Sequence, residues 1–302
     1  MTRTTPDPLY MMAYDHRQVL RDLYGQAAEG RFTETKLVAL DVLDRVAAAG
    51  VPRAALGFLV DEEYGAPAAR TARQRDIYLA MPIEASRTKI FELQYPADYA
   101  ERFAGFQPEC VKALVFHNPA DDDARKEVQF TRIAEVATWA HRHGHDFLLE
   151  VLVTPTAAQL AGCGEDTAAF RREALPGLLV ESIAEYQARG IEPDIWKIEG
   201  LDTVEACEAV GAQATVGGRG QVRCIVLGSG ASLQTVGTWL RAAARVPAFA
   251  GFAVGRSVWH RPLGDLLAGT ATRDEAVDRM VAAFTGLIDA FGRTDLEMTL
   301  RA

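Results

Sequence analysis

A lysine lies inside one of the short apolar runs of this chain. In the stretch Ile-Trp-Lys-Ile-Glu-Gly at residues 195–200, apolar residues flank Lys197, as in a buried strand. Burying an ammonium group is costly, and a buried lysine with a lowered pKa is what Schiff-base chemistry on a carbonyl substrate requires. The alternative is a structural lysine neutralised by Glu199, which points the same way two residues later. The stretch favours carbonyl chemistry at Lys197.

Two further charges interrupt neighbouring apolar runs. Lys112 lies near the start of residues 111–116, and Glu150 lies inside residues 147–153. If these strands and that of Lys197 are consecutive in a barrel and all three side chains point inward, they form a lysine–carboxylate–lysine cluster. The neighbouring cation would lower the pKa of Lys197, and Glu150 could transfer protons to a carbinolamine. A buried ion network that only neutralises itself is the alternative.

Two glycine-containing segments follow the last two apolar runs. Gly228, Ser229 and Gly230 follow residues 223–227, and Gly255 and Arg256 follow residues 250–254. Glycines let backbone N–H groups approach an oxyanion, and a helix starting after Gly230 would present its positive end. Arg256 would add a charge-assisted contact. A tight turn alone could explain one Gly-x-Gly, but the two segments together predict a phosphate site.

The carboxylates at predicted strand ends also allow a metal site to be considered. Asp61, Glu62, Glu84 and Glu150 could gather a magnesium ion, because hard cations prefer oxygen ligands. No spacing singles out such a site, and the histidines and cysteines form no recognisable metal motif. We therefore expect no metal, and keep a metal-dependent lyase as an alternative.

The elements that must position these residues follow one repeating order. Eight apolar runs occur at residues 10–14, 55–60, 77–83, 111–116, 147–153, 195–199, 223–227 and 250–254. Amphipathic, helix-like stretches occur between and after them, at residues 34–49, 125–142, 171–189, 204–210, 233–244 and 273–291. The pattern predicts a single-domain α/β protein with a (β/α)8 barrel over residues 1–302, residues 1–8 being a flexible segment. A doubly wound sheet is less favoured, since no glycine-rich dinucleotide fingerprint follows the first run.

Composition narrows the classes of partner. The 302 residues carry a net charge of −9 with scattered basic residues, so we expect no nucleic-acid partner. We find no run as long as a membrane span and no signal-peptide pattern. The four cysteines are widely separated, which fits a reduced, cytoplasmic protein. A homo-oligomer is compatible with the sequence, but no apolar patch can be assigned to an interface.

The motifs together resemble a known family, the aldolase-type (β/α)8 domain that accompanies deoxy-ketogluconate kinases of inositol catabolism. This domain belongs to the wider class I aldolase group, with the tagatose-bisphosphate and sulfofructose-phosphate aldolases. The resemblance covers nearly the whole chain. It rests on Tyr-Asp-His-Arg at 14–17, Leu-Val-Asp-Glu-Glu-Tyr-Gly at 59–65, Val-Lys-Ala-Leu-Val at 111–115, Pro-Asp-Ile-Trp-Lys-Ile-Glu-Gly at 193–200 and Gly-Phe-Ala-Val-Gly-Arg at 251–256.

The resemblance implies roles for individual residues. Lys197 would form the Schiff base with no other cofactor, assisted by Lys112, Glu150 and Asp15, and Arg256 would hold phosphate. Further substrate contacts are expected at Gly228, Ser229, Gly230, Gly255, Glu199 and Asp61. One departure is Ser229, where closer relatives are expected to carry arginine; this removes a positive charge from the phosphate loop.

The substrate implied by the resemblance is a small phosphorylated sugar or sugar acid. The expected reaction cleaves 2-deoxy-5-keto-gluconate 6-phosphate into dihydroxyacetone phosphate and malonate semialdehyde. Another phosphosugar and a non-catalytic phosphosugar-binding module remain alternatives. A carboxylate on the substrate would need a second cation, and the sequence does not choose among Arg17, Arg87, Lys89 and His117.

Overall fold

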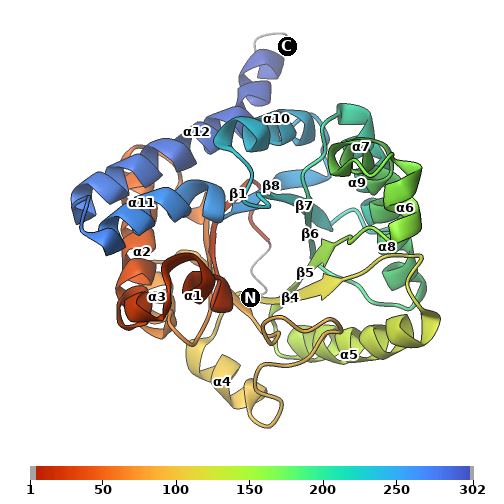
Figure 1. Ribbon diagram of the computed structural model, residues 1–302, viewed down its shortest axis with the longest axis horizontal. Coiled ribbons are helices and arrows are strands. Elements are labelled where there is room, and N and C mark those ends of the chain that lie inside the picture. The colour runs from red at the N-terminus through yellow and green to blue at the C-terminus, as the bar shows by residue number, and fades with distance from the viewer. Residues whose placement is uncertain (1–4, 300–302) are drawn as a thin grey trace.

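Eight parallel strands close into one barrel in chain order, with β1 paired to both β2 and β8 (Figure 1). The computed structural model describes residues 5–299, with side chains to residue 292. The strands are β1 Leu9–Tyr14, β2 Leu56–Val60, β3 Tyr78–Pro82, β4 Cys110–Phe116, β5 Asp146–Leu152, β6 Ile195–Glu199, β7 Arg223–Leu227 and β8 Phe249–Val254. The closure confirms the predicted (β/α)8 barrel over an open sheet.

The barrel interior is filled by side chains that alternate along each strand with side chains packed against the helices. One apolar cluster lies inside the barrel and includes Ala13, Cys110, Leu148, Ile195 and Ile225. Residues two positions further along a strand point the same way. The inward positions that follow Cys110, Leu148 and Ile195 are therefore Lys112, Glu150 and Lys197. Apolar packing below these charges fixes the direction in which they point.

Helices surround the barrel and contribute the outer half of a second, larger apolar core (Figure 1). The α-helices are α1 Gln18–Tyr24, α2 Phe32–Ala48, α3 Ala66–Gln74, α4 Tyr99–Phe106, α5 Asp123–Arg142, α6 Ala157–Gly162, α7 Thr167–Glu173, α8 Leu175–Ala188, α9 Val204–Thr215, α10 Leu233–Ala243, α11 Arg256–Ala268 and α12 Arg273–Thr299. The long α12 packs against α10, α11 and α2, and so covers the seam where β8 meets β1.

Several helices differ from the sequence prediction. The stretch 171–189 is two helices, because Pro176 occupies the first turn of α8 and lacks the N–H that a continuous helix would need. Helix α11, which contains Pro262, was not predicted. Helix α9 extends to Thr215, five residues beyond the predicted stretch, and its N-cap is Thr203, whose side chain accepts a hydrogen bond from the Ala206 amide.

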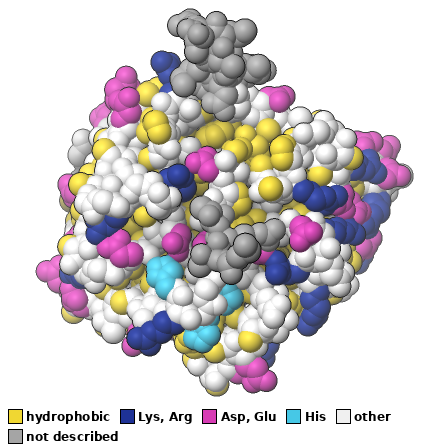
Figure 2. Space-filling model, turned by 180° about the vertical axis from the view of Figure 1, so that it is seen from behind, with side chains coloured by type: hydrophobic (Ala, Val, Ile, Leu, Met, Phe, Trp, Pro, Cys, Tyr) yellow, Lys and Arg dark blue, Asp and Glu magenta, His cyan; other side chains and the backbone are white. Residues whose placement is uncertain are grey.

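The face of the molecule seen in Figure 2, on the reverse of the view in Figure 1, carries interspersed acidic and basic side chains with hydrophobic ones among them. Thr5 donates a hydrogen bond of 2.9 Å to Asp146 at the start of β5, and Arg223 donates one of 2.9 Å to Asp7. Residues 1–4 of the segment predicted to be flexible lie outside the described residues. Within residues 5–299, no helix is long and apolar enough to cross a membrane.

Candidate active site

A cavity of about 570 Å³ opens at the carboxyl ends of the strands. In this fold, the carboxyl-terminal face is where the loops that follow the strands build active sites. Its lining comes from β1 and β3 to β8 or the loops that follow them, and includes most of the predicted site residues: Asp15, Lys112, Glu150, Lys197, Glu199, Gly228, Ser229, Gly230, Gly255 and Arg256. A wider, shallow hollow over α5 contains none of them.

Lys197 and Lys112 share one carboxylate. Nζ of Lys197 lies 3.0 Å from Oε1 of Glu150, and Nζ of Lys112 lies 3.0 Å from its Oε2. Lys197 and Lys112 are 4% and 1% exposed, and Glu150 is 7% exposed, so water screens these contacts little. The structure thus forms the lysine–carboxylate–lysine cluster. It excludes the alternative pairing of Lys197 with Glu199, because that carboxylate has another partner.

Lys112 also holds two more carboxylates. Its Nζ lies 2.8 Å from Oδ2 of Asp15 after β1 and 2.6 Å from Oε1 of Glu84 after β3. A buried ammonium with three carboxylates around it is strongly stabilised in its charged form. Although burial opposes the charge, the carboxylates of Asp15, Glu150 and Glu84 raise the pKa of Lys112 well above its ordinary value. Lys112 is therefore a fixed positive charge at the floor of the cavity.

The carboxyl groups of Asp15, Glu150 and Glu84 have pKa values shifted in different directions. Burial favours the neutral form of Asp15, but the charges of Lys112 and Lys197 outweigh it and hold the pKa of Asp15 well below its ordinary value. Burial likewise opposes the charge of Glu150, and the same two lysines lower its pKa. For Glu84 burial prevails over Lys112 and raises the pKa. Environments that divide neighbouring carboxyl groups in this way are typical of acid–base sites.

Glu199, at the end of β6, is held at the cavity wall by an arginine from α7. Its Oε1 accepts 2.8 Å from Arg171 of α7, and its Oε2 accepts 3.1 Å from the amide of Val153. Burial raises the pKa of Glu199 against the opposing charge of Arg171. The carboxylate is thus held in a fixed position beside β5, where it can contact substrate.

The predicted anion segments after β7 and β8 meet at one side of the cavity. A Cβ on Gly230 would lie 3.1 Å from Cζ of Arg256, so the guanidinium packs directly on this glycine. Ser229 and Gly230 both have positive φ angles, 51° and 71°. Among the described residues, Arg256 has no hydrogen bond or ion-pair partner, and no side chain caps α11, which begins at Arg256. An unpaired cation at an uncapped helix N-terminus is a suitable anion site.

Gly255 allows this site to form because two chain segments come very close there. A Cβ at position 255 would lie 2.1 Å from the carbonyl oxygen of Ala13 and 3.0 Å from Nε1 of Trp259. Trp259 donates to that same carbonyl at 3.0 Å, which ties α11 to the end of β1. Only glycine fits at this position, and its role is to bring α11 to the cavity.

Asp61 is the predicted site residue that the structure does not bring to the cavity. Its Oδ1 lies 2.5 Å from Nζ of Lys36 on α2, and its Oδ2 accepts from the amide of Tyr64 at 2.8 Å. Lys36 also donates to the carbonyls of Tyr14 and His16. Both side chains of the pair are buried, at 0% and 1% exposure. The carboxylate therefore anchors the loops after β1 and β2 to α2.

Each of the carboxylates considered as metal ligands contacts a basic side chain. Glu62 accepts from Arg102 at 2.7 Å, Asp61 is held by Lys36, and Glu84 and Glu150 both contact Lys112. Within residues 5–292, no three histidine, cysteine or acidic side chains are arranged to hold a metal ion. At the point where three carboxylates converge, the structure has an ammonium group.

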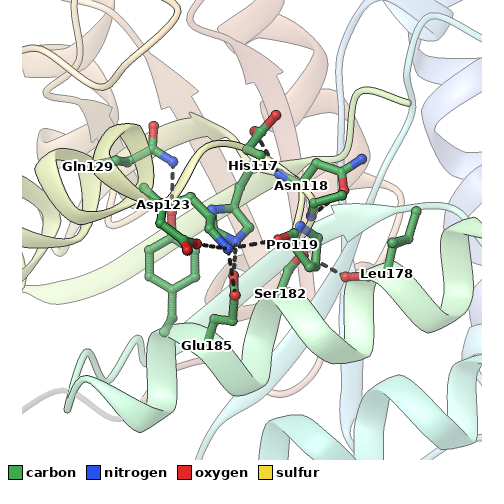
Figure 3. A network of polar contacts seen from close by, with 12 residues as sticks. His117, Asn118, Pro119, Asp123, Gln129, Leu178, Ser182 and Glu185 are labelled. Carbon is green, nitrogen blue, oxygen red and sulfur yellow. Dashed lines mark hydrogen bonds and ion pairs between the residues drawn. The ribbon is translucent and has the colours of Figure 1, made fainter. Parts of the chain in front are cut away.

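His117 points away from the cavity into a separate polar network between α5 and α8 (Figure 3). Its Nε2 lies 2.7 Å from Oε2 of Glu185, whose Oε1 accepts from Lys126 at 2.9 Å. Asn118 extends the network by donating to the carbonyl of Thr154 at 2.9 Å. These contacts fix the loop after β4, and they leave His117 no contact with the cavity.

Three cavity residues had no assigned role in the predicted aldolase chemistry: His16, Glu84 and Arg17, the last being one of four candidate cations for a substrate carboxylate. His16 and Arg17 directly follow Asp15 in the sequence, and Glu84 follows the third apolar run. Their place after predicted barrel strands was the available signal. What the sequence lacked was the convergence of Glu84 and Asp15 on Lys112.

Comparison with known proteins identifies one matching family and several solved structures of similar fold. The pattern of a family described as "Uncharacterized protein conserved in bacteria (DUF2090)" matches residues 1–295. No curated protein sequence matches the chain.

The structure is similar to a Schiff base forming fructose-1,6-bisphosphate aldolase, with 14% identity over 93% of this chain and 94% of that one and a TM-score of 0.57. It is similar to a fructose-bisphosphate aldolase from Plasmodium falciparum, with 13% identity over 95% and 91% and a TM-score of 0.62. A Corynebacterium glutamicum protein has 17% identity over 92% and 85% and a TM-score of 0.59. At these identities the likeness establishes a shared fold.

Proposed function

The chain belongs to the DUF2090 family, and we propose that it is a class I aldolase that forms a Schiff base through Lys197. The observation that carries the proposal is the single carboxylate of Glu150 between two buried lysines, 3.0 Å from each. One lysine is fixed as a cation by three carboxylates, and the other has one partner that can accept its proton. Two of the proteins with a similar fold are named as fructose-bisphosphate aldolases, one of them as Schiff base forming.

The geometry supports the following steps for forming the covalent intermediate. Glu150 accepts a proton from Nζ of Lys197, and the neutral amine attacks the ketone carbon of the substrate. The C–N bond forms, and a proton passes from the attacking nitrogen to the carbonyl oxygen, which becomes a hydroxyl. Glu150 then returns its proton to this hydroxyl, which leaves as water, and an iminium remains on Lys197. Lys112 stays charged throughout and assists ionisation of the neighbouring carboxylates.

Cleavage uses the iminium as an electron acceptor. A carboxylate removes the proton from the hydroxyl on the carbon beyond the scissile bond, and Asp15, kept ionised by Lys112, is placed for this. The C–C bond breaks, its electron pair forms an enamine with the iminium, and the aldehyde half departs. Protonation of the enamine carbon and addition of water then release the ketone product and restore the amine. These steps need no other cofactor.

The charge of the cavity favours an anionic substrate. On a chain of net charge −9, five basic side chains and four acidic ones line the cavity, among them Arg256 with no partner. We therefore assign phosphate to Arg256, the uncapped start of α11 and the Gly228–Gly230 segment, which would position the ketone near Lys197. By resemblance the substrate is 2-deoxy-5-keto-gluconate 6-phosphate, cleaved to dihydroxyacetone phosphate and malonate semialdehyde.

Borohydride trapping tests this proposal. The protein is incubated with dihydroxyacetone phosphate and sodium borohydride, and its intact mass and peptides are analysed. The expected result is one reduced adduct, located on Lys197 and absent from Lys197→Met. If the protein binds dihydroxyacetone phosphate in calorimetry but gives no adduct, the aldolase proposal is overturned in favour of a binding module or a lyase of another mechanism.

A further inference from the structure

One corner of the cavity has polar atoms that none of these steps uses. We call it the β1–β3 corner and define it by His16 and Arg17, which follow β1, and Glu84, which follows β3. In the closed strand order, β3 lies across the barrel from β7, which leads into the phosphate segment. A substrate anchored by phosphate beside β7 and β8 and bound to Lys197 on β6 would extend toward this corner.

Arg17 is a buried cation with little compensation. It is 6% exposed, and Nη2 donates one hydrogen bond of 2.8 Å to the carbonyl of Glu84. Its Nε is buried without a partner, and among the described residues it forms no ion pair with a carboxylate. Buried charges are normally paired, because removing a charge from water is costly. A ligand with a negative charge would supply the missing partner.

Two other atoms of the corner are unsatisfied in the same way. Nδ1 of His16, which lies 3.6 Å from Oδ1 of Asp15, and Oε2 of Glu84 are both buried without a hydrogen-bond partner. Burial lowers the pKa of His16 to about 3, which keeps the imidazole neutral, and raises the pKa of Glu84 against the opposing charges of Lys112 and Arg17. A neutral imidazole can donate one hydrogen bond to a ligand oxygen. Arg17 and His16 can therefore both act as donors toward one anion, while Glu84 stays bound to Lys112.

The other candidate cations are unsuited to this role. Arg87 is exposed and already paired with Asp22, and Lys89 does not line the cavity. His117 is bound to Glu185 outside it (Figure 3). Of the four candidates, Arg17 alone combines a place in the cavity with an unpaired charge.

We propose that the β1–β3 corner binds a carboxylate on the half of the substrate that leaves as an aldehyde, with Arg17 as the residue that determines this specificity. The inference rests on the proposed function, since it places the two halves of the substrate on either side of Lys197. One planar guanidinium beside a neutral imidazole matches a planar, singly charged carboxylate. A phosphate dianion would call for a second cation, which the corner lacks.

Binding without chemistry provides the test. The probes are 2-deoxygluconate 6-phosphate, whose alcohol in place of the ketone cannot form a Schiff base, and 2-deoxyglucitol 6-phosphate, which has a hydroxymethyl group instead of the carboxylate. In the wild-type protein, calorimetry should give a Kd for 2-deoxygluconate 6-phosphate about 10- to 100-fold lower than the Kd for 2-deoxyglucitol 6-phosphate. The reason is that hydrogen bonds to a charged group contribute about 1.5–3 kcal/mol.

Arg17→Gln should reduce this preference to about threefold or less. The matched control is Arg87→Gln, which removes an equal charge from the exposed edge of the same cavity and should keep the wild-type ratio. Equal affinity of the wild-type protein for both probes, or binding of neither, would overturn the proposal. So would a ratio that depends on Arg87 and not on Arg17. The ratio of the two Kd values for the wild-type protein tests the carboxylate preference even if Arg17→Gln does not fold.

Trapping with dihydroxyacetone phosphate separates this inference from the aldolase proposal. That ligand has no carboxylate, so Arg17→Gln should give the Lys197 adduct at a rate within about twofold of the wild type. An adduct without a carboxylate preference refutes the corner and supports the aldolase. A carboxylate preference without an adduct supports the corner and refutes the aldolase.

Discussion

The carboxylate of Glu150 lies 3.0 Å from Nζ of Lys197, and the two residues are direct partners in the register of β5 and β6. Both side chains point into the barrel from rigid, hydrogen-bonded strands. The other oxygen of Glu150 contacts Lys112, so the carboxylate cannot turn away from Lys197 without losing a second ion pair. The proposed proton-transfer partner of Lys197 is thus held in position in the free protein.

Glu150→Gln should slow Schiff-base formation strongly and weaken binding little. The amide keeps the size and a hydrogen-bond acceptor but cannot take a proton from Lys197 or return one to the carbinolamine. Loss of a positioned acid–base group typically costs about 10²- to 10⁴-fold in rate. We expect a loss of that size in the borohydride-dependent inactivation rate, with the Kd for dihydroxyacetone phosphate within a few-fold of the wild type.

The matched control for this variant is Glu173→Gln. Glu173 is exposed at the end of α7 and pairs only with its neighbour Arg172 among the described residues. Its removal should leave the inactivation rate unchanged. A Glu150→Gln protein that traps dihydroxyacetone phosphate as fast as this control would show that another group transfers the proton.

Arg256→Ala should separate phosphate binding from the chemistry of Lys197. The guanidinium has no partner among the described residues, so its removal leaves no buried acidic group uncompensated. Losing a charge-assisted contact should weaken dihydroxyacetone phosphate binding by about 10- to 100-fold. Trapping of unphosphorylated dihydroxyacetone should change by less than about twofold. An equal loss with both ketones would mean that Arg256 acts on the reacting centre and not on phosphate.

Asp61→Asn should destabilise the fold without changing substrate affinity. Asp61 is the ion-pair partner of Lys36, which is fully buried, and removing one member of a buried pair costs about 3–5 kcal/mol. Urea denaturation measures this loss. Asp44→Asn is the control, because Asp44 forms half-buried pairs with Arg53 and Arg75 and should cost about 1 kcal/mol or less. An increase in KM with unchanged stability would instead make Asp61 a substrate ligand, as the sequence suggested.

The central cluster could be predicted because strand periodicity determines it. Lys112, Glu150 and Lys197 occur at inward positions of three consecutive apolar runs, and a closed barrel brings such positions together. The repeating order of strands and helices was enough to indicate that closure. The same reasoning placed Arg256 and Gly228 at the ends of adjacent strands.

Pairings between distant segments could not be predicted in this way. Asp61 is held by Lys36 and Glu199 by Arg171, each from a helix that precedes it in the chain, and neither partner shares a periodic pattern with its acid. Helix α11 was missed because Pro262 interrupts its pattern, although its uncapped start forms part of the proposed anion site. Partner choice depends on side-chain reach in three dimensions, which one sequence does not reveal.

Three histidines whose pKa is lowered in the folded protein should make it less stable as the pH falls from about 6.5. Burial lowers the pKa of His16 to about 3 and also lowers the pKa of His117 and His145. Below their ordinary pKa near 6.5 these groups take up protons in the unfolded chain before they do so in the native one. The unfolded state then binds more protons, so the free energy of unfolding decreases as the pH decreases.

His16→Asn isolates the contribution of one such group. A single proton bound only by the unfolded state changes the free energy of unfolding by about 1.4 kcal/mol per pH unit. Urea denaturation between pH 6 and pH 4.5 should therefore show a shallower loss of stability in His16→Asn, by about that amount per unit.

His141→Asn should have the opposite effect and so serves as the control. The hydrogen bond to Asp194 raises the pKa of His141, so this group stabilises the native state below pH 6.5 and loses that effect as the pH rises. Its removal should steepen the rise of stability with pH near neutrality. If His16→Asn and the wild type lose stability with the same slope, then His16 becomes protonated in the native state. A charged imidazole in the cavity would then be an additional cation for the substrate.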